Sequence, residues 1–107
     1  MPLIKLEYDD AKVPDKEIEA LSKAVRDIVS EVTGIADVFV YANTAKIKVQ
    51  IAPIEIFVEM SAHKISNADE LIAKIKEKIS NWKKENNFQH PINLTLIPMN
   101  WKVEIDI

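Results

Sequence analysis

The stretch Pro2-Leu3-Ile4-Lys5-Leu6-Glu7-Tyr8 decides the fold, because the chain repeats its design in Pro53-Ile54-Glu55-Ile56-Phe57-Val58-Glu59-Met60. Each stretch opens with proline and then alternates its side chains with a period of two, which is typical of a β-strand. Apolar side chains occupy both faces of both strands, as Leu3 next to Ile4 illustrates in the first. The sequence therefore predicts two strands that are buried on both sides.

An amphipathic helix is predicted after each of these strands. Apolar residues recur at three- and four-residue spacing, so each helix buries one face. These residues are Ile18, Leu21, Val25, Ile28, Val29 and Val32 in the first helix and Leu71, Ile72, Ile75, Ile79 and Trp82 in the second. Asp15 and Asp69 stand at the helix entrances, where a carboxylate caps free N–H groups and meets the positive end of the dipole. Gly34 is a natural C-terminal stop for the first helix.

Two further strands are predicted after each helix. Residues 38–42 correspond in position to residues 92–96, although few residues are identical. Residues 46–51 correspond to residues 102–107, and in both segments polar and β-branched residues alternate. The chain is therefore a strand–helix–strand–strand unit used twice, with a period of about 54 residues.

This repeat predicts an α+β fold. A crossover through a helix makes its flanking strands parallel. Two such units can share one four-stranded mixed sheet with both helices on one face, with residues 46–51 and 102–107 as short extra strands. We expect one domain over residues 1–107, built from pseudo-repeats 1–51 and 52–107. Because the strands are apolar on both faces, the sequence also predicts that another subunit covers the free face of the sheet.

Composition excludes several classes of function. A length of 107 residues suits one compact domain. The net charge of −3 argues against nucleic-acid binding, and the absence of cysteine excludes disulfide scaffolds, cysteine zinc sites and thiol catalysis. The single glycine, Gly34, cannot supply the loops that bind nucleotide phosphates. His63 and His90 have no partner at metal-ligand spacing, so no metal site is expected.

The sequence carries no signal for a membrane or for export. No apolar stretch approaches the roughly 20 residues that span a bilayer. The N-terminus lacks the basic-then-apolar pattern of a secretory signal. We therefore expect a soluble, cytoplasmic protein without a membrane partner.

Pro2 is the candidate catalytic residue. If Met1 is removed after synthesis, the ring nitrogen of Pro2 becomes a free secondary amine that can accept a proton. In an apolar pocket the pKa of this amine should fall, because desolvation disfavours its charged form. A base whose pKa lies near neutrality is what proton abstraction requires. With Met1 retained, the nitrogen is acylated and this chemistry is lost.

Three segments, together with the repeat, resemble one family. The segments are Met1-Pro2-Leu3-Ile4, Lys12-Val13-Pro14-Asp15 and Pro98-Met99-Asn100, the last similar to an aspartate-methionine-asparagine turn before a final strand. They resemble the tautomerase superfamily, in the layout of macrophage migration inhibitory factor, where both repeats lie in one chain. The resemblance implies a homotrimer with three active sites at subunit boundaries, Pro2 as general base, and no metal or organic cofactor. It also implies enolisable keto acids or enols as substrates, with a proton moved between carbon and oxygen.

The same resemblance assigns substrate-binding residues. Lys12 stands where 4-oxalocrotonate tautomerase, a short-chain relative, carries a substrate-binding arginine. It is expected to hold a substrate carboxylate, with lower affinity because lysine lacks the two-pronged guanidinium contact. Lys64 has the equivalent place in the second repeat. Asn93 is expected to donate a hydrogen bond to a developing oxyanion. The aromatic residues are most simply core or subunit-contact residues, and of these we also expect Phe39 and Trp101 beside the pocket.

Two departures from the family pattern leave alternatives open. Thr33-Gly34 is followed by Ile35 where migration inhibitory factors have a lysine, and Asn93 stands where their fifth strand has a tyrosine. These departures argue against the migration factor activity itself and leave the substrate class open. One alternative is a non-catalytic trimer of the same fold that binds a ligand or a protein. Another is a ferredoxin-like regulatory module that binds a metabolite between its repeats.

Overall fold

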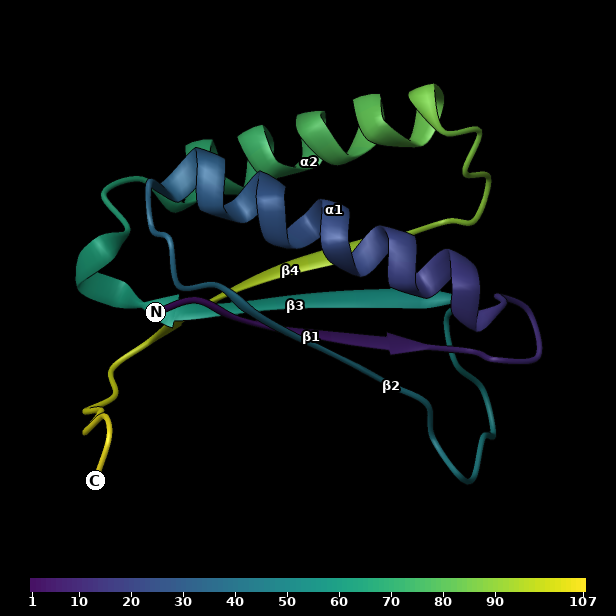
Figure 1. Cartoon of the computed structure of the whole chain (residues 1–107), viewed down its shortest axis with the longest axis horizontal. Helices are drawn as coiled ribbons and strands as arrows, with labels where there is room; N and C mark the ends of the chain where they lie inside the picture. The colour runs from purple at the N-terminus through teal and green to yellow at the C-terminus, as the bar shows by residue number, and fades with distance from the viewer.

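Both helices lie on one face of a four-stranded sheet (Figure 1). The computed structural model describes residues 1–107. The elements follow one another as β1 (Leu3–Tyr8), α1 (Asp15–Thr33), β2 (Phe39–Asn43), β3 (Ile54–Ser61), the short 3-10 helix η1 (Ala62–Lys64), α2 (Ala68–Glu85) and β4 (Asn93–Met99). The predicted α+β class is confirmed. Neither α1 nor α2 combines the length and the apolar character needed to cross a membrane.

The sheet is mixed, with the strand order β2-β1-β3-β4. β1 runs parallel to β2 and β3 parallel to β4, while β1 and β3 are antiparallel neighbours at the centre. Leu3 marks the register, since it lies between Phe39 of β2 and Glu59 of β3. The two strands of each strand–helix–strand unit are direct neighbours, whereas the split arrangement of a ferredoxin-like module places another strand between them. The ferredoxin-like alternative is therefore wrong.

The core lies between the sheet and the two helices. Side chains on the helix-facing side of the central strands are fully buried, namely Ile4, Leu6, Ile54, Ile56 and Val58. They pack against the predicted stripes of the helices, whose buried members are Ile18, Leu21, Val25, Val29, Ile75 and Ile79. The apolar faces of the strands and of the helices therefore form one core layer, as predicted.

The helix entrances differ from the prediction in one respect. Asn67 caps α2, because its Oδ1 accepts the N–H of Glu70 at 3.0 Å. α1 begins after Pro14, which offers no side-chain cap. Asp15 and Asp69 lie within the first turns, where they meet the positive end of the dipole. The prediction that they cap the helices is wrong, because a capping side chain comes from the residue before the first turn.

Gly34 ends α1 as predicted, with a φ of 71° and its N–H bonded to the carbonyl of Ser30. A Cβ at this position would meet no atom within 4 Å, so only the backbone conformation opposes a side chain. We expect Gly34→Ala to lower the free energy of unfolding by about 1 kcal/mol, and Gly34→Asn by less, since asparagine tolerates the left-handed region. Urea unfolding measures both, and equal losses for the two variants would contradict this account.

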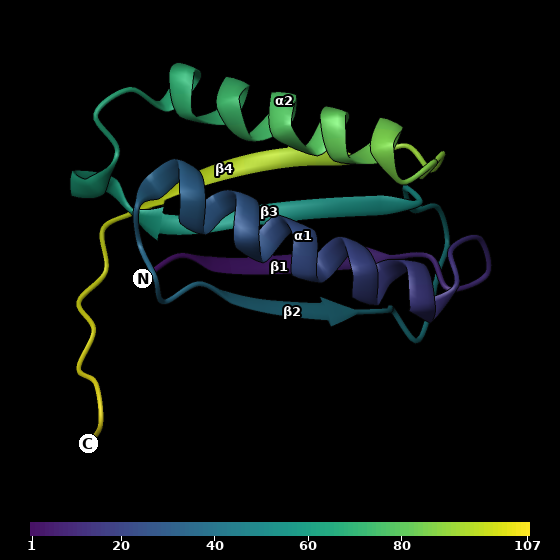
Figure 2. The ribbon, with the colours of Figure 1, turned by 45° about the horizontal axis from the view of Figure 1, so that its top comes forward.

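Residues 46–51 and 102–107 form no strands, contrary to the prediction. A strand needs hydrogen bonds to a neighbour, and the sheet ends at β2 and β4 without either segment. Apolar side chains in both are left in solvent, since Ile47 is 82% exposed, Val49 97% and Ile105 70%. The C-terminal segment leaves the end of β4 and points away from the sheet (Figure 2).

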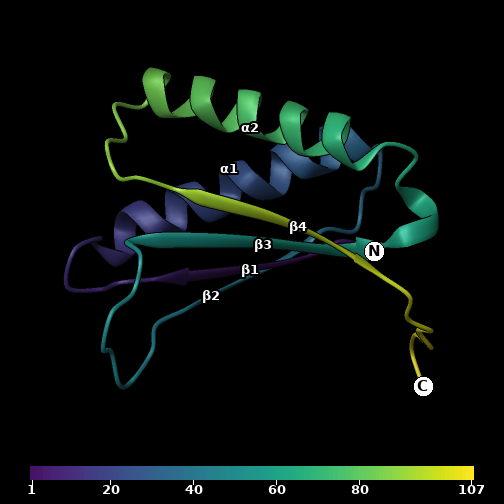
Figure 3. The same cartoon turned by 180° about the vertical axis from the view of Figure 1, so that it is seen from behind.

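The face of the sheet opposite the helices has no covering layer in the single chain (Figure 3). Leu3 and Phe57 of the central strands lie on this face, on the side opposite the buried Ile4 and Ile56. Phe39 of β2, which pairs with Leu3, is exposed there. The covering of this face by another subunit stays a prediction.

Candidate functional site

Pro2 is fully buried where the chain enters β1. Its carbonyl accepts the backbone N–H of Phe39 at 3.2 Å, which ties the start of β1 to the start of β2. Val38, the residue before Phe39, is also buried, whereas Met1 is exposed. The ring of Pro2 is therefore enclosed by the fold, while the residue that blocks its nitrogen is accessible.

Phe39, Lys64 and Trp101 lie at the same end of the sheet as Pro2. Since β3 runs antiparallel to β1, its C-terminal end reaches this end, together with that of its parallel neighbour β4. Lys64 closes η1 directly after β3, and Trp101 follows β4. Lys64 also lines a cavity of about 250 Å³ together with Val32, Ile65, Ser66, Asn67 and Lys74. The fold thus gathers four of the six predicted site residues at one end of the sheet.

Lys12 and Asn93 lie at the opposite end. Lys12 follows the C-terminal end of β1 and is exposed. Asn93 begins β4, where its Nδ2 donates to Oε1 of Glu55 at 2.9 Å. The six residues of β1 span roughly 17 Å at about 3.3 Å per residue. Pro2 and Lys12 of one chain are therefore too far apart to bind the same small substrate, and a site that uses both requires two chains.

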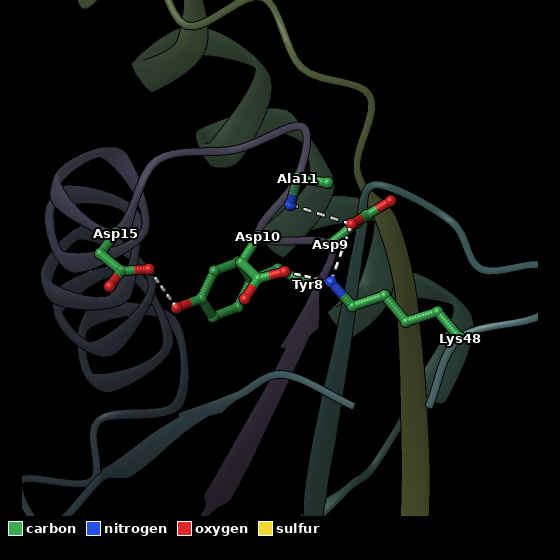
Figure 4. Close-up of polar contacts among 6 residues, drawn as sticks. All are labelled: Tyr8, Asp9, Asp10, Ala11, Asp15 and Lys48. Atoms are coloured by element: carbon green, nitrogen blue, oxygen red, sulfur yellow. Dashed lines mark hydrogen bonds and ion pairs between the residues drawn. The ribbon is translucent and has the colours of Figure 1, made fainter. Parts of the chain in front are cut away.

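A polar cluster at the Lys12 end was not predicted from the sequence (Figure 4). Lys48 Nζ lies 3.1 Å from Oδ1 of Asp9 and also pairs with Asp10. The same Oδ1 accepts the backbone N–H of Ala11 at 3.1 Å. Lys48 arrives from the 46–51 segment, far from the aspartates in sequence, so the adjacent aspartates are the only local signal for this cluster.

Tyr8 extends the cluster toward α1. Its hydroxyl donates to Oδ1 of Asp15 at 2.6 Å, which ties the end of β1 to the first turn of α1. This hydrogen bond is the main reason that the pKa of Tyr8 lies above 10.0. Figure 4 shows the Tyr8 ring pointing to Asp15, away from Lys48.

The contacts of Asp9 and Lys48 favour the charged forms of these two side chains. The N–H of Ala11 and then the ammonium of Lys48 hold the pKa of Asp9 below 3.8. The hydrogen bond to Asp10, with that to Asp9, raises the pKa of Lys48 above 10.5 against the opposing effect of burial. Asp9 and Lys48 are therefore both charged at neutral pH.

The shift of Asp9 predicts how stability depends on pH. Because its folded pKa lies below the unfolded value of 3.8, the ionised carboxylate stabilises the fold above about pH 4, and this contribution is lost as pH falls through the folded pKa. We expect Asp9→Asn to lower the urea midpoint at pH 7 and to change it much less at about pH 2. A difference between wild type and variant that stays constant over this range would contradict the assignment.

The two histidines make local contacts. His63 Nδ1 lies 2.6 Å from Oγ of Ser61, and His90 Nε2 lies 2.7 Å from Oε2 of Glu17. The second contact joins the connection before β4 to α1. The structure gathers no group of three or more His, Cys, Asp or Glu residues that could hold a metal ion.

Comparison with known proteins identifies the fold. No family model matches the sequence, and no curated protein matches it. A malonate semialdehyde decarboxylase has a TM-score of 0.71 at 11% identity, with 95% of this chain and 90% of that chain covered. MIF2 of Leishmania major has a TM-score of 0.66 at 16% identity over 98% of this chain and 94% of that one. A fused 4-OT has a TM-score of 0.64 at 11% identity over 94% and 91%. The chain therefore has the tautomerase fold, in its macrophage migration inhibitory factor-like form.

Proposed function

We propose that the protein is a cofactor-independent tautomerase that moves a proton within an enolisable keto acid, with Pro2 as general base. The burial of Pro2 at the start of β1 is the observation that supports this most directly. Removal of Met1 leaves the ring nitrogen as a secondary amine in an apolar setting, and such a setting favours the uncharged, basic form. The tautomerase-like fold supports the same reading.

The reaction needs one group that takes a proton and returns it. In the enol-to-keto direction, the Pro2 nitrogen accepts the proton of the enol hydroxyl, and the enolate that forms holds its charge on oxygen. The resulting ammonium then donates that proton to carbon, so the C–H bond forms and the amine is restored. No electrons are gained or lost, and every proton is accounted for. A single base suffices for both steps.

The cation that binds the substrate carboxylate comes, in this proposal, from another chain. Lys12 is exposed and takes part in none of the ion pairs of the chain. It lies at the far end of β1 from Pro2, so a homotrimer that brings the Lys12 end of one subunit to the Pro2 end of the next completes one site at each boundary. Asn93 lies at the same end of the subunit as Lys12 and would donate a hydrogen bond to the oxyanion. Phe39, Lys64 and Trp101 line the Pro2 side.

Two solved structures support this assignment by likeness. The malonate semialdehyde decarboxylase was solved in wild-type form, with the proline at its first position replaced by alanine, and in an inactivated form. The fused 4-OT is described as an asymmetric trimer. In the present chain, the uncovered sheet face and segments 46–51 and 102–107, which pair with no strand, offer the surface that such an assembly needs.

Turnover by the processed protein tests the proposal. Intact mass establishes whether Met1 is absent, light scattering gives the number of subunits, and the decay of phenylpyruvate or hydroxyphenylpyruvate enol gives the rate. We expect a processed trimer with a rate well above that of buffer. A processed trimer without turnover would favour the alternative, a non-catalytic protein that binds a ligand or a partner through the same fold.

A further inference from the structure

The backbone that carries Lys12 is held at both sides. The carbonyl of Asp9 accepts the N–H of Lys12 at 3.0 Å and that of Val13 at 2.9 Å, and the N–H of Asp9 donates to the carbonyl of Pro53 at 3.0 Å. Asp9 is 7% exposed, and Val13 is fully buried. The exposed side chain of Lys12 therefore projects into solvent from a turn whose backbone is hydrogen-bonded and packed on both sides.

This turn places Lys12 beside two carboxylates. Asp9 and Asp10 precede it in the same turn, and the ammonium of Lys12 contributes to the low pKa of Asp9, after the larger effects of the Ala11 N–H and of Lys48. Two unpaired carboxylates so close would attract the Lys12 ammonium and repel a substrate anion. Lys48 occupies both of them, with its Nζ 3.1 Å from Oδ1 of Asp9 and in contact with Asp10.

We propose that Lys48 is a positioning residue for the anion site: by pairing with both Asp9 and Asp10 and offsetting one of their two negative charges, it leaves Lys12 free to bind a carboxylate. Asp15, the next acidic residue along the chain, is bonded to the Tyr8 hydroxyl. With Lys48 in place, the side chains of Asp9, Asp10, Lys12 and Lys48 sum to no net charge. Without it they carry one negative charge. This inference rests on the proposed function only in taking Lys12 as the carboxylate anchor.

The test uses two variants with opposite expected signs. Lys48→Met keeps the aliphatic stem but removes the charge, and we expect it to weaken carboxylate binding by about threefold to tenfold. Asp10→Asn leaves Lys48 paired with Asp9 and removes one negative charge, so binding should strengthen by about threefold. Lys48→Arg should restore wild-type affinity. Lys46→Met makes the same charge change in the same segment, at a lysine that takes part in no ion pair, and should have a much smaller effect.

The readout is the dissociation constant of 3-phenylpropionate, a carboxylate that does not react, measured by titration calorimetry on the processed oligomer. The neutral 3-phenylpropionamide serves as the control ligand, because its affinity should not follow the charge of the variants. A loss of folding would weaken the binding of both ligands in both variants. The charge effect instead weakens carboxylate binding in Lys48→Met and strengthens it in Asp10→Asn. The difference in carboxylate affinity between the two variants should also become smaller at high salt.

Each outcome decides one of the two proposals. Opposite shifts for the carboxylate support the role of Lys48, even in a protein that shows no enol turnover, in which case the proposed function alone fails. Shifts of the same sign, equal effects of Lys46→Met and Lys48→Met, or no binding of 3-phenylpropionate by the wild type would overturn the role of Lys48. Enol turnover that persists alongside such a result leaves the proposed function standing.

Discussion

Replacing Pro2 with alanine is expected to slow enol turnover by about 100-fold or more, because a positioned general base contributes roughly 10²–10⁴ in rate. Alanine keeps an N-terminal amine, but this amine is primary and lacks the ring that holds the nitrogen in one orientation. Since the Pro2 ring is fully buried, alanine also removes apolar atoms that keep water from the nitrogen. The measurement is kcat for phenylpyruvate enol, with circular dichroism and light scattering to show that fold and assembly persist.

Two controls separate the amine from the ring. Pro53 precedes β3 as Pro2 precedes β1, but its nitrogen lies inside the chain, so Pro53→Ala should keep its turnover. A protein that retains Met1 keeps the Pro2 ring, but the Pro2 nitrogen is then part of an amide and is not basic, so this form should be at least as slow as Pro2→Ala. Full turnover by the form that retains Met1 would rule out Pro2 as the base, whatever the variants show.

The elements of the fold were predictable because each is encoded by a local period. The alternation around Ile4 and Leu6 places β1, and the three- and four-residue spacing around Leu21 and Val25 places α1. Gly34 marks a helix end because few other residues adopt its φ of 71°. Such signals depend only on residues close in the chain, so they can be recognised from the sequence alone.

The site was less predictable because it depends on contacts between distant residues. A strand runs in one direction, so β1 carries Pro2 and Lys12 to opposite ends of the sheet of one chain. That another subunit brings them together in one site stays a prediction. The pairing of Lys48 with Asp9 joins two loops and leaves no periodic pattern. In an alternating segment, a lysine such as Lys48 is typical of a solvent-facing strand position. Only the three-dimensional arrangement shows its two carboxylate partners.

The two missing strands have the same origin. Residues 102–107 alternate polar and apolar side chains as a strand should, yet they pair with neither edge of the sheet in the single chain. Both sheet edges, β2 and β4, have a row of backbone groups without a strand beside it, and such edges pair readily with another chain. The alternation therefore predicts a strand whose partner belongs to a second copy of the protein, and this has a measurable consequence.

Ending the chain at Trp101 is expected to convert the proposed trimer into monomers. The deletion removes Val103, Ile105 and Ile107, which are exposed in the single chain. Burial of each such side chain contributes about 1.5–3 kcal/mol, so their loss amounts to on the order of 5 kcal/mol per chain. That corresponds to more than about 1,000-fold in the association constant. Sedimentation velocity over a range of protein concentrations measures the change, and enol turnover should fall with it, because Lys12 and Pro2 would no longer meet.

A single substitution makes the test specific to strand pairing. Ile105→Pro removes one backbone donor and fixes φ, so it should weaken the assembly, whereas Ile105→Val keeps both the donor and the β-branched shape and should leave it intact. Both variants keep the 14 buried residues of the core unchanged, so the urea midpoint of the isolated monomer should be the same for each. A truncated chain that still sediments as a trimer would show that the segment lies outside the subunit contact, and the assembly would then depend on the open face of the sheet around Leu3 and Phe57.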